Sequence, residues 1–128
     1  MKFNPPDTWR VSKPVITKLP STTKEHYMTV NRGYVITDYD SLVKTFGPPS
    51  IRGSSDNKVR VKWVLKADDG TIITIYDYKE NVPITQMRWF NVGGFSRDKH
   101  ELDILQRLGF NIAEDYYDMP LGVKYHEV

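Results

Sequence analysis

The segment from residue 59 to residue 78, VRVKWVLKADDGTIITIYDY, constrains the fold more than any other part of the chain, because its residues alternate in character. Successive side chains of a β-strand point to opposite faces of a sheet, so this pattern predicts two strands. Asp68-Asp69-Gly70 between them is typical of a turn. We therefore predict an antiparallel hairpin with one apolar face, made of Val59, Val61, Trp63, Leu65, Ile73 and Ile75.

The other face of this hairpin is predicted to be basic and aromatic. It would carry Arg60, Lys62 and Lys66 on the first strand and Tyr76 and Tyr78 on the second. Cations bind phosphate and tyrosines stack on bases, so such a face suits a nucleotide or a segment of nucleic acid. The alternative is a solvated face, on which lysine and arginine stems cover apolar surface.

A third strand is predicted in QMRWFNV, residues 86 to 92. Alternation there places Met87 and Trp89 on one face and Arg88 and Phe90 on the other. Arg88 and Phe90 therefore join the predicted ligand-binding face.

Two elements are predicted before the hairpin. YMTV and YVIT, on either side of residues 31–33, indicate a short β-hairpin. A short helix should follow, capped by Thr37 or Asp38 and ended by Gly47, because prolines come directly after that glycine.

A second helix is predicted from residue 97 to residue 108, capped by Ser96 and closed by Gly109. The tail beyond it is irregular, apart from a weak strand at residues 122–128. Together these elements predict an α+β fold: a mostly antiparallel sheet of about four to six strands with two helices on one face.

Gly93 and Gly94 separate the third strand from this helix. Backbone N–H groups at such a point can cradle phosphate, so both glycines are candidate ligand-binding residues, as a secondary site. The spacings of the dinucleotide-binding and P-loop motifs are missing. We favour the alternative, a tight turn that needs positive φ.

The chain of 128 residues fits a single domain, from residue 25 to residue 128, preceded by a proline-rich extended arm at residues 1–24. Pro5, Pro6 and Pro14 disfavour regular structure in the arm. We expect the arm to pack on the domain or on a second subunit, which would make the protein a homo-oligomer.

The amino-acid composition excludes several kinds of functional site. The absence of cysteine excludes disulfides, thiolate zinc sites and cysteine nucleophiles. No apolar run approaches the length of a membrane span, so no membrane partner is expected. The net charge of +2 is too small to indicate nucleic acid by itself.

No catalytic motif is present, and we predict a non-enzymatic protein without catalytic residues, cofactor or metal. His26, His100 and His126 make no i, i+4 pair that would indicate a metal site. The alternative is a small hydrolase that uses Asp69 or Asp77 with a histidine, because carboxylates in different environments can do acid–base work.

Three stretches, YDSLVKTFGPPS, VRVKWVLKADDGTIITIYDYK and RWFNVGGFSRDKHELDIL, lie in this order between residues 39 and 106. The order of a helix ending in Phe-Gly-x-Pro, a Trp strand, an Asp-Gly hairpin and Trp-x-x-Gly-Gly resembles small uncharacterised proteins of bacteriophages and large DNA viruses. The resemblance implies a virus-encoded binding protein in the host cytoplasm or the virion.

Such a protein would sequester a nucleotide, or bind nucleic acid, to counter host defence. The alternative that the resemblance implies is a protein–protein interaction module, which acts as an inhibitor of a host protein or as a structural component of the virion and binds a host or viral protein.

Overall fold

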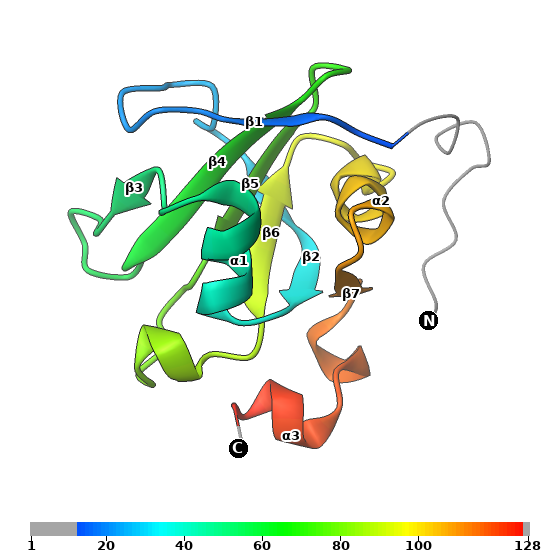
Figure 1. Cartoon of the computed structure of the whole chain (residues 1–128). Coiled ribbons are helices and arrows are strands. Elements are labelled where there is room, and N and C mark those ends of the chain that lie inside the picture. Colours follow the sequence, from blue (N-terminus) through cyan, green and yellow to red (C-terminus); the bar gives the residue numbers. More distant parts are fainter. Residues whose placement is uncertain (1–12, 127–128) are drawn as a thin grey trace.

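The computed structural model describes residues 13–126, and its centre is a seven-stranded sheet in which every pair of strands is antiparallel. The strands follow the order β1-β4-β5-β6-β2-β7, and β3 pairs with β4 on the edge that also holds β1 (Figure 1). Their bounds are Ile16–Lys18 (β1), Val30–Ile36 (β2), Ile51–Arg52 (β3), Val61–Ala67 (β4), Ile72–Tyr76 (β5), Phe90–Gly94 (β6) and Asn111–Ala113 (β7).

The predicted α+β class is therefore confirmed. The sheet has more strands than expected because β1, β3 and β7 are only two or three residues long, and such short edge strands leave little pattern in a sequence. β1 lies within the predicted arm; residues 1–12 of that arm are outside the described residues. No helix between residues 13 and 126 has the length and apolar character that crossing a bilayer requires.

The hairpin of β4 and β5 forms as predicted. Trp63 pairs with Ile75 and Leu65 with Ile73, and all four side chains are buried in the main core. Gly70 adopts the positive φ of 90° that the turn needs. Lys62 pairs with Tyr76, so these two side chains share the opposite face.

Two helices cover the core face of the sheet. Helix α1 (Tyr39–Phe46) is capped by Asp38, whose side chain accepts a hydrogen bond from the Ser41 N–H over 2.8 Å, and it ends at Gly47, as predicted. Helix α2 (His100–Arg107) begins three residues later than predicted. The predicted cap is wrong: the Ser96 N–H donates to the Glu101 carboxylate over 2.9 Å.

The predicted hairpin around residues 31–33 is wrong, because β2 is one continuous strand between β6 and β7. Gly33 forms a bulge in this strand. A Cβ atom there would lie 2.7 Å from the Ala113 carbonyl oxygen and 2.8 Å from Leu102. The glycine is thus required by close packing and by its φ of 153°, and it makes no turn between two strands.

The alternation predicted for residues 86 to 92 is also wrong. A 3-10 helix, η2 (Ile84–Gln86), precedes β6, so the strand pattern starts only at Phe90. Phe90 and Met87 are buried in the main core, whereas Trp89 points to the other face. Met87 and Trp89 belong to the loop between η2 and β6, so the two-residue period of a strand does not apply to them.

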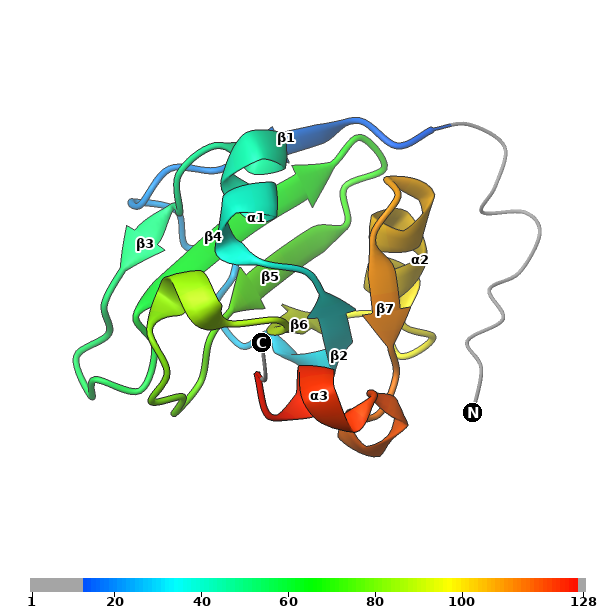
Figure 2. The ribbon, with the colours of Figure 1, turned by 60° about the horizontal axis from the view of Figure 1, so that its bottom comes forward.

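The tail folds against the second face of the sheet. It contains η3 (Tyr116–Asp118) and α3 (Leu121–Lys124) in place of the predicted strand, whose last two residues lie outside the described part. The Trp89 indole N–H donates to the Lys124 carbonyl over 3.0 Å, and His126 stacks on Trp89. This cluster anchors α3 beside β2 (Figure 2).

Arg60 and Asp77 close the open end of the β4–β5 hairpin. The buried Asp77 carboxylate accepts the backbone N–H groups of Arg60 and Val61 and pairs with the Arg60 Nε over 2.6 Å. The guanidinium also donates to the Val82 carbonyl over 2.7 Å. Arg60 is therefore held by the protein itself at the start of the strand.

We expect Asp77→Ala to destabilise the protein by about 3 kcal/mol, because two backbone donors and a half-buried guanidinium would lose their acceptor. Urea unfolding followed by circular dichroism measures this loss. Asp98→Ala, at an exposed carboxylate, is the matched control and should leave the midpoint nearly unchanged. Equal midpoints for the two variants would show that Asp77 does not stabilise the hairpin.

Candidate functional site

The second face of the sheet lies opposite α1 and α2. Strand register places there the side chains of Asn31, Tyr34, Lys62, Val64, Lys66, Ile72, Thr74, Tyr76 and Asn91, together with Gly93. The tail covers this face beside β2. The segment from residue 19 to residue 29 crosses it behind β4 and β5 in the view of Figure 1. Lys62 and Tyr76 remain partly exposed on this face.

The crossing segment touches the sheet at several points. The Leu19 N–H donates to the Val64 carbonyl over 2.8 Å, and Glu25 pairs with Lys66 over 3.0 Å. Thr29 lies close to Gly93, and the charge of Lys62 acts on His26. Sequence periodicity gave no sign that this segment lies over the sheet, because its polar residues are those of a solvated loop.

The three cations predicted on this face have different environments. Arg60 is bound to Asp77 and does not join the face, which corrects the prediction for that residue. Lys66 does lie there, but its charge is balanced by Glu25. Lys62 is half-buried and makes neither an ion pair nor a hydrogen bond with any residue between 13 and 126.

Lys62 lies over the ring of Tyr76, with its Nζ 5.5 Å from the ring centroid. Burial lowers the pKa of Lys62, because the ammonium loses part of its hydration. The cation–π contact supplies some attraction, but an aromatic face compensates a lost hydration shell less fully than a carboxylate or phosphate does.

Two amide side chains lie beside Tyr76, on the side away from Lys62. The Asn31 side-chain NH₂ donates to the Asn91 side-chain oxygen, and Asn91 in turn donates to the Tyr76 carbonyl, each over 3.2 Å. Burial raises the pKa of Tyr76, so its phenol stays neutral and keeps a proton to donate. The site therefore combines one cation with neutral polar groups.

His26, in the crossing segment, lies close enough to Lys62 for the lysine charge to act on it. Burial, and then the charge of Lys62, lower the pKa of His26, so the imidazole is neutral when the segment is in place. Its ring lies 5.1 Å from that of Tyr27, which is exposed. No sequence motif marked His26, Asn31 or Asn91, because they come together only through strand register and the path of the loop.

The other predicted residues lie in different places. Tyr78 follows β5, is 44% exposed, and has Lys79 over its ring. Phe90 is fully buried in the main core, so its prediction as a ligand-facing residue is wrong. Arg88 precedes β6 and lines a cavity at the end of the sheet, away from Lys62.

Gly93 and Gly94 belong to β6, and neither has a positive φ. A Cβ atom at Gly93 would overlap the Thr74 hydroxyl, and one at Gly94 would overlap the Glu101 carboxylate. Both glycines are thus required by close approach, and the favoured prediction of a tight turn is wrong. Glu101 already accepts the Ser96 N–H, so a protein carboxylate occupies the position where a phosphate would be cradled.

The alternative prediction of a small hydrolase requires Asp69 or Asp77 to contact a histidine. Asp69 and His100 meet over 2.8 Å, although they are 31 positions apart. Burial works to raise the pKa of Asp69, but hydrogen bonds from Thr71 and the contact with His100 lower it to about 2. A carboxylate with this pKa is a weak general base at neutral pH. Between residues 13 and 126, no three His, Asp or Glu side chains are grouped to hold a metal ion.

No protein-family model, curated protein or solved structure matches the chain. The resemblance to viral proteins therefore stays a prediction.

Gly93→Ala should destabilise the protein by about 2–3 kcal/mol, since the new methyl group would overlap Thr74 inside a covered sheet. Thr74→Ala removes the obstructing hydroxyl and should restore much of that loss in the double variant. A double-mutant cycle of unfolding free energies measures the coupling. Strictly additive losses would contradict the close contact.

The stability of the protein should fall as the pH drops below 6.5, the ordinary pKa of histidine, because the unfolded chain then takes up a proton that His26 in the folded protein resists. The fall should continue until the pH reaches the lowered pKa of His26. Urea midpoints at several pH values measure it. His26→Gln should show a shallower decline than the wild type, and identical declines would contradict this role.

Proposed function

We propose that the protein is a non-enzymatic binding protein that holds the phosphate of a nucleotide at Lys62, on the second face of the sheet. The observation that carries the proposal is the environment of Lys62. It is a half-buried cation without a carboxylate partner between residues 13 and 126, beside the neutral phenol of Tyr76.

A partly desolvated ammonium without an anion costs free energy in the unliganded protein. A phosphate placed beside Lys62 would recover that cost through a charge-assisted hydrogen bond. The Tyr76 hydroxyl offers a neutral donor next to the same point, and such a donor favours an anion without repelling it.

The environments of the other cations favour a single nucleotide over a strand of nucleic acid. A strand is held by several cations along a track, whereas Lys66 is balanced by Glu25 and Arg60 by Asp77. Two exposed rings, Tyr27 beside His26 and Tyr78 two positions after Tyr76, provide surfaces on which one base could stack. Binding without turnover would suit the sequestering role that the viral resemblance implies.

A second candidate function is a protein–protein interaction module. Four apolar side chains that stand near one end of β2 and β6 are exposed: Tyr27, Met28, Val30 and Phe95. Exposed apolar groups of this kind are common in interfaces. The mass of the protein in solution separates the candidates, since a nucleotide-binding role at Lys62 needs no second subunit.

Calorimetric titration with ATP, AMP and inorganic phosphate tests the nucleotide proposal. We expect Lys62→Ala to weaken binding of the tightest of these ligands by about tenfold or more, which is the effect of losing one charge-assisted bond. Lys44→Ala, at an exposed lysine on α1 across the core, should bind as the wild type does. Binding should also weaken as salt increases.

Two results would overturn the assignment. One is a wild-type protein that binds none of the three ligands at millimolar concentration. The other is equal affinity of the wild type and Lys62→Ala, with both variants shown to be folded by circular dichroism.

A further inference from the structure

Lys62 and Lys66 lie on the same side of β4, four residues apart, and their environments differ. Register places both side chains on the second face of the sheet, with Val64 between them. At about 3.3 Å per residue, their backbones are about 13 Å apart. Lys62 lies over the ring of Tyr76, whereas the Lys66 Nζ is 3.0 Å from the Glu25 carboxylate. A carboxylate of the protein thus occupies an anion position near the proposed phosphate site.

The crossing segment brings Glu25 to this position together with its neighbour His26. Glu25 pairs with Lys66, and the charge of Lys62 acts on His26. Because two consecutive residues reach both lysines, one small molecule with two linked anionic groups can also reach both. Linked phosphates have this form, and each phosphate accepts charge-assisted hydrogen bonds.

The ion pair is the one hydrogen-bonded contact of a side chain from residues 20–29 with the described part of the sheet. The other hydrogen bonds of these residues stay within the segment, such as the one that the Thr23 N–H donates to the Pro20 carbonyl over 3.1 Å. The segment can therefore keep its own hydrogen bonds when Glu25 leaves Lys66.

Both partners of this ion pair are exposed, since 44% of the Lys66 side chain and 47% of the Glu25 side chain are accessible to solvent. Exposed ion pairs contribute little to stability, because water screens them. A phosphate group can thus replace the Glu25 carboxylate at little cost, and it carries more negative charge. The same exchange is disfavoured at Arg60, because its partner Asp77 is buried and also accepts two backbone N–H groups.

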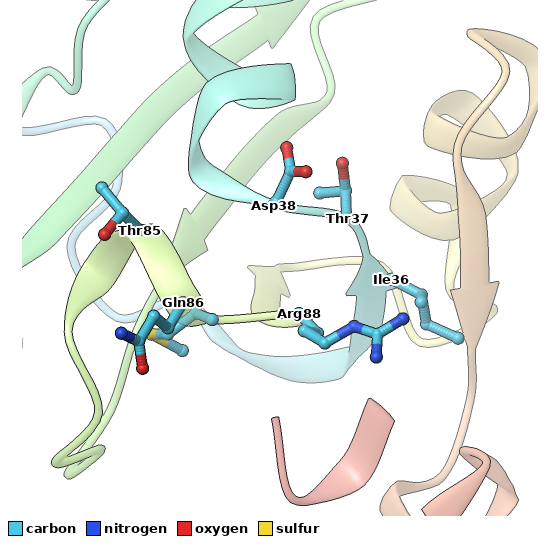
Figure 3. A pocket seen from close by; sticks show the side chains of 7 residues that line it. Ile36, Thr37, Asp38, Thr85, Gln86 and Arg88 are labelled. Carbon is cyan, nitrogen blue, oxygen red and sulfur yellow. The ribbon is translucent and has the colours of Figure 1, made fainter. Parts of the chain in front are cut away.

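The cavity that Arg88 lines offers no comparable anion position. It has a volume of about 600 Å³ and lies where β2 leads into α1 (Figure 3). Its carboxylate, that of Asp38, caps α1 by accepting the Ser41 N–H, and Arg88 already interacts with another group of the protein. Lys66 is therefore the candidate for a second phosphate, since it shares a face with Lys62.

We propose that the ligand carries at least two linked phosphates, as ADP and ATP do, and that the second phosphate binds Lys66 in place of Glu25. Glu25 then acts as a competitor within the protein, which neutralises Lys66 until such a ligand arrives. This inference rests on the proposed binding of a phosphate at Lys62. It goes further because it predicts selectivity for nucleoside diphosphates and triphosphates over monophosphates.

Calorimetric titration with ATP and with AMP, in magnesium-free buffer of constant ionic strength, tests this selectivity. Glu25→Gln keeps the size of the side chain and removes its charge, so it should tighten the binding of ATP by about threefold and leave that of AMP unchanged. Lys66→Ala should weaken the binding of ATP by about fivefold, again with little change for AMP.

Asp56→Asn is the matched control. Asp56 pairs with Lys58 over 3.8 Å in another exposed ion pair, and the substitution changes the net charge by the same amount as Glu25→Gln. This variant should bind both nucleotides as the wild type does. Melting temperatures establish that all the variants are folded.

Failure of this inference can be told apart from failure of the proposed function. If neither ATP nor AMP binds the wild type at millimolar concentration, both fail. If Lys62→Ala weakens the binding of both nucleotides, the phosphate site at Lys62 stands. An unchanged ratio of ATP affinity to AMP affinity in Glu25→Gln and Lys66→Ala would then refute the second phosphate position at Lys66.

Discussion

The register between β4 and β5 decides which side chains can meet on either face of the protein. It pairs Lys62 with Tyr76 and Trp63 with Ile75, so one step of the chain separates the cation from the core. Asp77 holds this register at the open end by accepting two backbone N–H groups of the opposite strand. A slip of one residue would bury Lys62 and expose Trp63, which hydrophobic burial strongly opposes.

Elements of the fold could be predicted from the sequence where a single local rule determines the structure. The β4–β5 hairpin followed from alternation, and α1 followed from its cap at Asp38 and its stop at Gly47. Prediction failed where a tertiary contact overrode the local pattern. Gly33 resembles a turn residue, but the approach of Leu102 and Ala113 makes it a bulge, and the loop between η2 and β6 breaks the alternation that was used to assign Phe90.

The same distinction explains the candidate site. Alternation identified Lys62, Lys66 and Tyr76, because these lie within paired strands. It failed for Arg60, which lies just outside β4, because a long side chain at a strand end follows its strongest partner. The partners that set the character of each cation, Asp77 and Glu25, come from distant positions that no periodicity connects.

His26 and Lys62 link the proposed binding site to proton uptake. The positive charge of Lys62 contributes to the lowered pKa of His26, so a bound phosphate that neutralises this charge would make protonation of His26 easier. Linkage is reciprocal, and a protonated His26 would therefore strengthen the binding of an anion at Lys62. A neutral His26 avoids the repulsion from Lys62, and an anion at the proposed site would offset the same repulsion.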